Sequence, residues 1–403
     1  MSLSCSVYAC PASARTLCPV RAAADKHSFL VGTCSLHEAN ELYVLEFDET
    51  TGQLDAASVY AHQDQVWAIE ASSQDAELVV TSRQSQQQAC SSSVTLWRMP
   101  ATAGATDKAA DLVEVAAVTR PENKQSYAHS IKWHPGSRDA LLVAEGFAVS
   151  LYSISESTVT CAGKLSLSKT SATGAGAGES DSSWVGTGAV AWDPSVAGSN
   201  SAAGAHGPHV SIFDTRTMTA TAELLNAHGG GAVRDVDYNP NKSHTLMTCG
   251  HDRACKIWDL RQPKAPIKVL SGHSHWASCC RYNPFHDQLL LTGGCDHGVV
   301  LWRATSASST ASSLGDGDAQ SAAEASAAAA AAAATGAASP GAASSPSSAD
   351  APDAKVRVLD QHEDSVYALA WSAADAWVHA SLSFDGRVVV DRVPTSEKYK
   401  ILL

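Results

Sequence analysis

Histidine and aspartate are the side chains of this sequence that most readily suggest chemistry. Sixteen histidines are spread over 403 residues, and imidazole and carboxylate groups serve both general acid–base catalysis and metal binding. One cluster combines two kinds of zinc ligand: His273, His275, Cys279 and Cys280. A tetrahedral site usually needs a second pair such as CxxC or HxxxH, and none completes this cluster. We therefore predict that the protein binds no metal and no cofactor.

Other motifs of known chemistry are incomplete. The run Gly-Ala-Gly-Ala-Gly at residues 174–178 resembles a loop that cradles phosphate, but no GK[ST] follows it and it lies in a low-complexity stretch. Serines are abundant, yet no G-x-S-x-G elbow occurs. We predict that the protein is not an enzyme, has no catalytic residues and takes no small-molecule substrate.

The overall charge narrows the range of partners. The 41 acidic residues exceed the 28 basic ones and give a net charge of -13, and the Lys and Arg residues are scattered along the chain. Such an excess of negative charge repels phosphate backbones, so we predict no nucleic-acid partner, and a role as a chromatin- or RNA-associated protein is disfavoured. No apolar run approaches the roughly 20 residues that span a bilayer. We predict no direct membrane insertion.

Eleven cysteines are present. Their number is odd and their spacing irregular, which does not suit a disulfide framework. Reduced thiols are typical of the cytosol. We therefore predict a cytoplasmic protein.

The sequence contains an internal repeat in which histidines recur at one position. Residues 227–261 and 272–303 each contain a His, an alternating stretch ending in Tyr-Asn-Pro, an apolar run, an Asp-bearing turn and a second stretch ending at Trp. Residues 361–392 keep this order. Weaker copies lie upstream, and the seven units end at Phe47, Trp97, Tyr152, Phe213, Trp258, Trp302 and Asp391. The spacing of the two neighbouring complete copies matches a repeat of roughly 40–45 residues.

The pattern within each unit predicts short strands. Apolar and polar residues alternate with period two, and Gly, Asn, Asp and Pro interrupt them. A single four-stranded sheet cannot cover both of its faces, so such sheets stack around an axis. We predict an all-β, seven-bladed propeller that forms one domain over residues 1–403. Residues 304–354, rich in Ala and Ser, are expected to be a disordered insertion between the sixth and seventh units.

The units resemble WD repeats, which form this kind of propeller. In that family a His, a Ser or Thr, an Asp and a Trp of each unit make a buried hydrogen-bond network. The resemblance assigns such structural networks to His228, Thr248, Asp252 and Trp258; to His273, Thr292, Asp296 and Trp302; and to His362, Ser381 and Asp385. Because these histidines have a structural role, a catalytic role for them is disfavoured.

The same resemblance implies an interaction surface at the narrow end of the channel. The starts of the innermost strands and the turns between second and third strands surround that end. By position, the candidate partner-binding residues are Trp67, Arg234, His251, Trp276, Tyr367 and Phe384. Aromatic residues and Arg are common anchors of interfaces. The alternative is that the aromatic side chains merely pack within their blades.

Several segments are similar to one family, the EARP- and GARP-complex-interacting proteins. They are FLVGT (29–33), LWRMP (96–100), NAHGGGAVRDVDYNPNK (226–242), HSHWASCCRYN (273–283), HDQLLLTGG (286–294) and, most specifically, residues 363–403. The resemblance implies a WD-repeat scaffold that binds subunits of EARP- and GARP-type multisubunit tethering complexes. It also implies a role in endosomal recycling and endosome-to-Golgi retrograde transport, and a place at the periphery of endosomes and the trans-Golgi network.

A rival interpretation rests on the sequence Trp258-Asp259-Leu260-Arg261, echoed at residues 213–216. It resembles the WDxR motif by which substrate receptors of cullin-RING ubiquitin ligases dock their adaptor. On that interpretation Asp259 and Arg261 would contact the ligase adaptor. Against it, Trp-Asp ends many repeats of this kind without any docking role.

Overall fold

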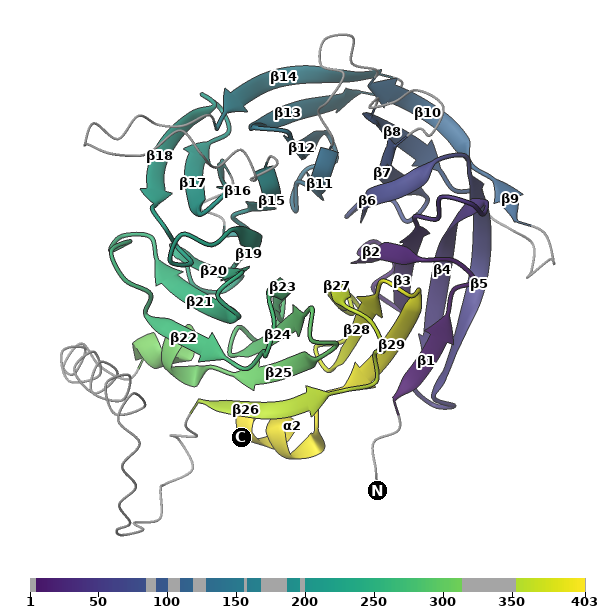
Figure 1. Ribbon diagram of the computed structural model, residues 1–403. Coiled ribbons are helices and arrows are strands. Elements are labelled where there is room, and N and C mark those ends of the chain that lie inside the picture. Colours follow the sequence, from purple (N-terminus) through teal and green to yellow (C-terminus); the bar gives the residue numbers. More distant parts are fainter. Residues whose placement is uncertain are drawn as a thin grey trace.

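The computed structural model describes residues 5–84, 92–100, 109–118, 128–155, 158–167, 187–195, 200–313 and 353–402. Seven antiparallel sheets stand around a central channel, which confirms the predicted seven-bladed propeller (Figure 1). The Gly-Ala-Gly-Ala-Gly run at 174–178 lies outside the described residues, as does most of the predicted insertion.

Each blade contributes one innermost strand to the channel. These strands are β2 (Ala14–Pro19), β6 (Gln65–Ala71), β11 (Ala128–Trp133), β15 (Thr187–Trp192), β19 (Val233–Tyr238), β23 (Ala277–Tyr282) and β27 (Val366–Trp371). The second strands are β3 (His27–Thr33), β7 (Leu78–Gln84), β12 (Ala140–Glu145), β16 (Ser201–His206), β20 (Thr245–Gly250), β24 (Leu289–Gly294) and β28 (Val378–Ser383).

The third and outer strands complete the sheets. The third strands are β4 (Asn40–Asp48), β8 (Ser92–Arg98), β13 (Ala148–Ser155), β17 (His209–Asp214), β21 (Ala254–Asp259), β25 (Val299–Arg303) and β29 (Arg387–Arg392). The outer strands are β5 (Gln53–His62), β10 (Val113–Val118), β14 (Thr158–Ser166), β18 (Thr219–Leu224), β22 (Lys268–Ser271), β26 (Ala354–Leu359) and β1 (Ser6–Ala9), and the short strand β9 (Ala110–Asp111) runs parallel to β5.

The ring closes between the two ends of the chain. Strand β1 pairs antiparallel with β29, from Ser6 opposite Val390 to Ala9 opposite Arg387. The first strand of the chain is therefore the outer strand of the last blade. This pairing joins the most distant parts of the sequence in one sheet, and it leaves no blade open at the point of closure.

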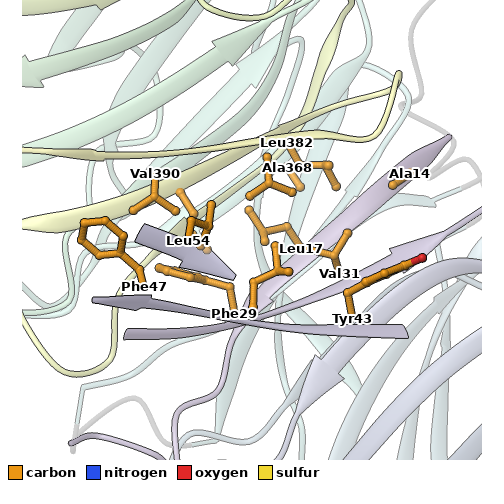
Figure 2. Packing of buried hydrophobic residues seen from close by; sticks show 14 of the residues in the cluster. Ala14, Leu17, Phe29, Val31, Tyr43, Phe47, Leu54, Ala368, Leu382 and Val390 are labelled. Atoms are coloured by element: carbon orange, nitrogen blue, oxygen red, sulfur yellow. The ribbon is translucent and has the colours of Figure 1, made fainter. Parts of the chain in front are cut away.

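The core lies between neighbouring blades. One buried cluster contains Phe29 and Val31 from the first blade together with Leu382 and Val390 from the seventh (Figure 2). All four side chains are essentially inaccessible to solvent. Because each sheet buries its faces against its neighbours, the blades are stable only as a closed ring.

The insertion interrupts a sheet of the sixth blade. Strand β26 pairs with β25, with Val299 opposite Leu359. Residues 304–353 therefore separate the third strand of that sheet from its outer strand, because a sequence unit is offset from a blade by one strand, and the last residue of the predicted insertion, Ala354, already belongs to β26. The first part of this stretch forms two short 3₁₀ turns, η2 (Thr305–Ala307) and η3 (Thr310–Ser313).

One α-helix, α2 (Thr395–Leu402), ends the described part of the chain and lies beside β26 (Figure 1). Within the described residues, no helix has the length and apolar character needed to cross a membrane. Ten cysteines fall in the described ranges, and each of these ten is a free thiol.

Candidate functional site

Each innermost strand contains a break in its pairing register close to its first residue. In six of these strands one residue is skipped in the ladder with the second strand, and in β15 the shift spans Thr187 to Val190. Such a β-bulge releases a residue from the ladder and re-aims its side chain. The released residues, which we call the bulge ring, are Arg15, Trp67, His129, Gly188, Arg234, Ser278 and Tyr367.

Arg15 links three blades across the bulge ring. Its guanidinium carbon lies 4.5 Å from the ring centroid of Trp67 and 5.2 Å from that of Tyr367. These are cation–π distances, and stacking holds the planar guanidinium in a fixed orientation. Ser278 serves another purpose, because its hydroxyl donates to the carbonyl of Val366 in the next blade.

The bulge ring is positively charged. Burial lowers the pKa of Arg15, and nearby Arg234 adds to this effect. Burial and the same two arginines lower the pKa of His129, so its imidazole is neutral at pH 7. Among the described residues, neither Arg15 nor Arg234 forms an ion pair. Asp235, which follows Arg234 in the sequence, pairs with Arg281, and Asp64, three residues before Trp67 of the ring, pairs with Arg83.

Two exposed aromatic rings flank the bulge ring. Trp276, which precedes β23, is 44% exposed and stacks on His251 with ring centroids 4.1 Å apart. Phe384, in the turn between β28 and β29, is 39% exposed, and its centroid lies 5.8 Å from that of Tyr367. Large exposed aromatic side chains beside an arginine are typical of interface anchors.

The structure brings the predicted partner-binding residues to one end of the channel. Trp67, Arg234 and Tyr367 are members of the bulge ring, and the other three candidates contact or flank it. The sequence-based prediction missed Arg15 and His129. His129 stands at the same place in its strand as Trp67, so the repeat alignment contained its signal. Arg15 had none, because the first strand of the first blade carries no recognisable repeat residues.

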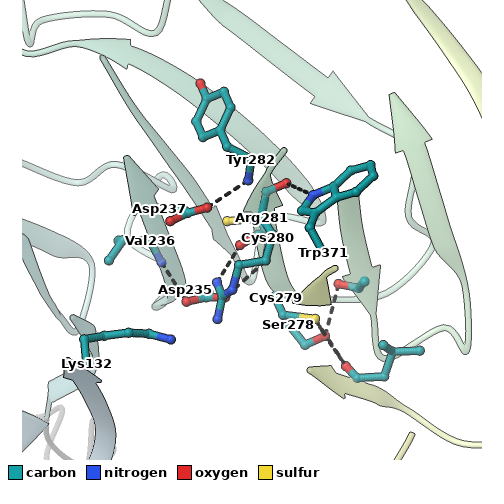
Figure 3. A network of polar contacts seen from close by, with 12 residues as sticks. Lys132, Asp235, Val236, Asp237, Ser278, Cys279, Cys280, Arg281, Tyr282 and Trp371 are labelled. Atoms are coloured by element: carbon teal, nitrogen blue, oxygen red, sulfur yellow. Dashed lines mark hydrogen bonds and ion pairs between the residues drawn. The ribbon is translucent and has the colours of Figure 1, made fainter. Parts of the chain in front are cut away.

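The opposite end of the channel differs in its charge pairing. A cavity of about 560 Å³ opens where the innermost strands end, and its lining includes Arg21, Glu70 and Lys132. Glu70 pairs with both cations, at 3.7 Å from Arg21 and 3.1 Å from Lys132. Arg281 also lines this cavity and pairs with Asp235 (Figure 3). The cations named here are thus matched by acids, unlike the arginines of the bulge ring.

The predicted structural networks have direct hydrogen bonds in the fifth and sixth blades. In the fifth, His228 Nδ1 lies 2.6 Å from Asp252 Oδ1, its Nε2 lies 2.8 Å from Thr248 Oγ1, and Trp258 Nε1 donates to that oxygen at 3.0 Å. In the sixth blade the matching distances are 3.0, 2.8 and 2.9 Å, through His273, Asp296, Thr292 and Trp302.

The seventh and second blades vary this scheme. His362 Nε2 bonds to Ser381 Oγ at 2.7 Å, but its Nδ1 bonds to Ser383 Oγ at 2.8 Å, and Asp385 in turn accepts from Ser383. The aspartate thus acts through a serine that the alignment did not assign. In the second blade, His62 bonds to Thr81 at 3.2 Å and uses the carbonyl of Asp64, at 2.6 Å, where other blades use a carboxylate.

Removing the carboxylate from a complete network should destabilise the protein. We expect Asp252→Ala to lower the free energy of unfolding by about 1–3 kcal/mol, because His228 loses a hydrogen-bond partner and Lys256 loses its ion-pair partner. The matched control is Asp360→Ala, since Asp360 is exposed and surface changes stay within about 0.5 kcal/mol. Urea unfolding measures both, and equal small losses would contradict a stabilising network.

The residues that suggested zinc have other partners. His273 is committed to Asp296 and Thr292, and Cys279 and Cys280 are buried within strand β23. Within the described ranges, no group of three or more His, Cys, Asp or Glu side chains is arranged to hold a metal ion.

The residues of the rival docking motif lie where the third strands end. The Arg261 side chain is 66% exposed, and its Nη2 lies 2.7 Å from Asp259 Oδ2. Arg216 and Asp214, where β17 ends, repeat this geometry at 2.8 Å. Each arginine therefore closes on the aspartate two residues before it, so an adaptor would have to compete with that ion pair.

Comparisons with known proteins agree with the repeat. A family model described as the EIPR1 β-propeller matches residues 2–302, and a WD domain, G-beta repeat model matches residues 354–390. The human protein named EARP and GARP complex-interacting protein 1 is 32% identical over 418 residues, which cover 98% of each chain. EARP-interacting protein 1 of Caenorhabditis elegans is 40% identical over 190 residues, 47% of each chain.

A solved structure supports the architecture alone. A chain of the COPII outer coat vertex on membranes has a TM-score of 0.64 to this chain and is 14% identical to it. The alignment covers 97% of this chain and 86% of that one.

Proposed function

Because the chain belongs to the EIPR1 β-propeller family of EARP and GARP complex-interacting proteins, we propose that it is a non-catalytic scaffold that binds such complexes. In this role it supports endosomal recycling and endosome-to-Golgi retrograde transport. It is cytoplasmic and reaches endosomes and the trans-Golgi network through its partners. The proposal rests on the likeness of the whole chain to proteins named for this interaction.

The bulge ring and its flanking aromatics are the proposed docking surface. The single observation that carries this assignment is the gathering of Arg15, Arg234 and exposed Trp276 at one end of the channel. Every blade adds a rigid strand to the ring, so binding there requires little ordering of the scaffold. Enzymatic activity has no support in this arrangement, because the histidines of the complete blades are occupied by their networks.

Affinity purification of the tagged full chain, followed by mass spectrometry, tests the proposed function. We expect subunits of tethering complexes to be recovered with the wild-type chain and with Arg261→Ala. Arg234→Glu should reduce their recovery at least about tenfold, because a charge reversal at an interface both removes an attraction and adds a repulsion.

The rival function makes the opposite prediction in the same experiment. Abundant ligase adaptor, lost on Arg261→Ala, together with absence of tether subunits, would overturn the scaffold proposal. If Arg234→Glu and wild type recover the tether equally, the docking surface does not lie at the bulge ring. Circular dichroism melting of each variant checks that the propeller remains folded.

A further inference from the structure

We propose that the bulge ring recognises an acidic segment of a partner protein, one that carries Asp or Glu beside an aromatic or other large apolar side chain. The inference concerns the chemistry of the ligand at the docking surface. It rests on the proposed function only for the identity of the protein that supplies the segment. The members of the bulge ring and the two flanking aromatic rings, Trp276 and Phe384, would contact this segment.

The charge of the ring selects an acidic ligand. Arg15 and Arg234 come from different blades, and the bulges of β2 and β19 release both at the same end of the channel, where Arg234 contributes to lowering the pKa of Arg15. Neither forms an ion pair with a carboxylate among the described residues, although the chain as a whole has a net charge of -13. Salt screens charges beyond about 8 Å at physiological ionic strength. A ligand in contact with the ring therefore experiences the arginines more strongly than the distant acidic residues.

The geometry of Arg15 prepares it to bind a carboxylate. Trp67 and Tyr367 stack against its guanidinium at 4.5 and 5.2 Å. A guanidinium that contacts aromatic rings can still donate from its N–H groups, and these match the two oxygens of a carboxylate. Because the side chain is already held in place, little of its rotamer entropy remains to be lost on binding.

The surroundings of the two arginines favour a peptide over a small anion. Trp276 and Phe384 present large exposed aromatic surfaces, and these would remain unused by a phosphate group. Gly188 contributes no side chain to the ring, because a Cβ at this position would lie 3.1 Å from the backbone carbonyl of Val233 in the next blade. His129 is neutral at pH 7, so the ring holds two full positive charges, fewer than the Arg and Lys clusters that bind polyphosphates.

Peptide selection on the purified full chain tests this inference without using any tether. The probe is a phage-displayed library of random 12-residue peptides, selected on the wild-type chain and counter-selected on Arg234→Glu. We expect the wild type to enrich peptides with Asp or Glu near Trp, Phe or Leu. Synthetic copies of these peptides should bind at least about tenfold more weakly to Arg234→Glu than to wild type. Replacing their Asp or Glu by Lys should recover part of the lost affinity for Arg234→Glu.

Two matched variants support the interpretation. Arg216→Glu alters an arginine that is exposed like Arg234 but closes on its own Asp214, so it should leave peptide affinity unchanged. Arg15→Gln should weaken binding as Arg234→Glu does. Because Arg15 packs against two aromatic rings, the melting temperature of Arg15→Gln is measured as well. If this variant unfolds, the affinity of Arg234→Glu decides the test, since Arg234 is exposed.

Other outcomes would overturn the inference. Enrichment of neutral or basic peptides would do so, as would equal affinity of acidic peptides for wild type and Arg234→Glu. Binding of inositol hexakisphosphate or of vesicles containing phosphatidylserine, lost on Arg234→Glu and not accompanied by peptide binding, would assign the ring to phosphate ligands. Acidic peptides that bind while no tether is captured would leave this inference standing and contradict the proposed function.

Discussion

Replacing Arg303 by methionine is expected to lower the free energy of unfolding by about 3–5 kcal/mol, because it leaves a buried carboxylate without its main partner. Arg303 ends strand β25 and forms an ion pair with Glu397 of helix α2. Only 4% and 8% of the two side chains are exposed. Lys400 also contacts Glu397, at 2.7 Å, but 46% of its side chain is exposed, so it replaces little of the lost interaction.

The ion pair matters because it fastens the C-terminal helix to the sixth and seventh blades. Ile401 of the helix packs against the cluster that contains Leu301 and Trp371, and Lys398 lies over the ring of Trp377 at 5.4 Å. Loss of the pair is therefore expected to loosen the helix together with this cluster.

A double variant separates the ion pair from general packing. Arg303→Met combined with Glu397→Met removes both buried charges and should recover most of the loss, since two apolar side chains of similar size need no partner. Lys400→Met is the control for surface charge and should change stability by less than about 1 kcal/mol. Urea unfolding measures all four proteins. If Arg303→Met alone is as stable as wild type, the attachment of α2 does not depend on this ion pair.

Acidification from pH 7.5 to pH 5 is expected to lower the free energy of unfolding by several kcal/mol, because two buried histidines and one half-buried histidine are neutral in the folded protein. Burial lowers the pKa of His379 to about 3 and the pKa of His362 and of His206 to about 4. Arg357 contributes to the shift of His379. In the unfolded chain each of these histidines takes up a proton near pH 6.5.

The direction of the effect follows from proton linkage. Below pH 6.5 these histidines are protonated in the unfolded state but not in the folded state. The free energy of unfolding therefore falls until the pH reaches the pKa of each histidine in the folded protein. At pH 5 this amounts to about 2 kcal/mol for each histidine. Asp237 acts in the opposite sense, because burial raises its pKa to about 6 and its protonation below that pH favours the folded state.

A substitution at His379 isolates one of these contributions. His379 packs edge-on against Trp371 with ring centroids 5.3 Å apart, so His379→Phe keeps a ring of similar shape and cannot be protonated. Its stability should fall by about 2 kcal/mol less than that of wild type between pH 7.5 and pH 5. The exposed His37 provides the control, as His37→Phe should follow the wild-type pH curve. Parallel curves for His379→Phe and wild type in urea unfolding would refute this origin of acid sensitivity.

Much of the architecture was already present in the sequence as a repeat. The period between the Trp258 and Trp302 units predicted a propeller, and the alternation within each unit predicted its strands, because both patterns are local. Seven aromatic or aspartate endings gave the number of blades, which the structure confirms. The networks around His228 and His273 were assigned through the resemblance to WD repeats, whose pattern places all of their residues within a single repeat.

Other features required the closed ring. The pairing of β1 with β29, and the contact of Arg15 with Tyr367, join residues from opposite ends of the chain. No repeat pattern indicates such contacts, because the sequence units say nothing about where the ring closes. The same limit applies to Ser383, which relays the bond from His362 to Asp385 although the family pattern does not mark that position.

The sequence by itself thus determined the fold, the blade count and the residues that stabilise the complete repeats, because these depend on spacing within a unit. The repeat pattern had also placed Trp67, Arg234 and Tyr367 at one end of the channel, whereas only the tertiary structure added Arg15 and the bulges that release these residues from their ladders. Basic residues that are scattered in the sequence, such as Arg15 and Arg234, meet there because bulges in separate strands release one residue from each blade toward the same end of the channel. The candidate docking surface is for that reason a property of the assembled ring and of no single repeat.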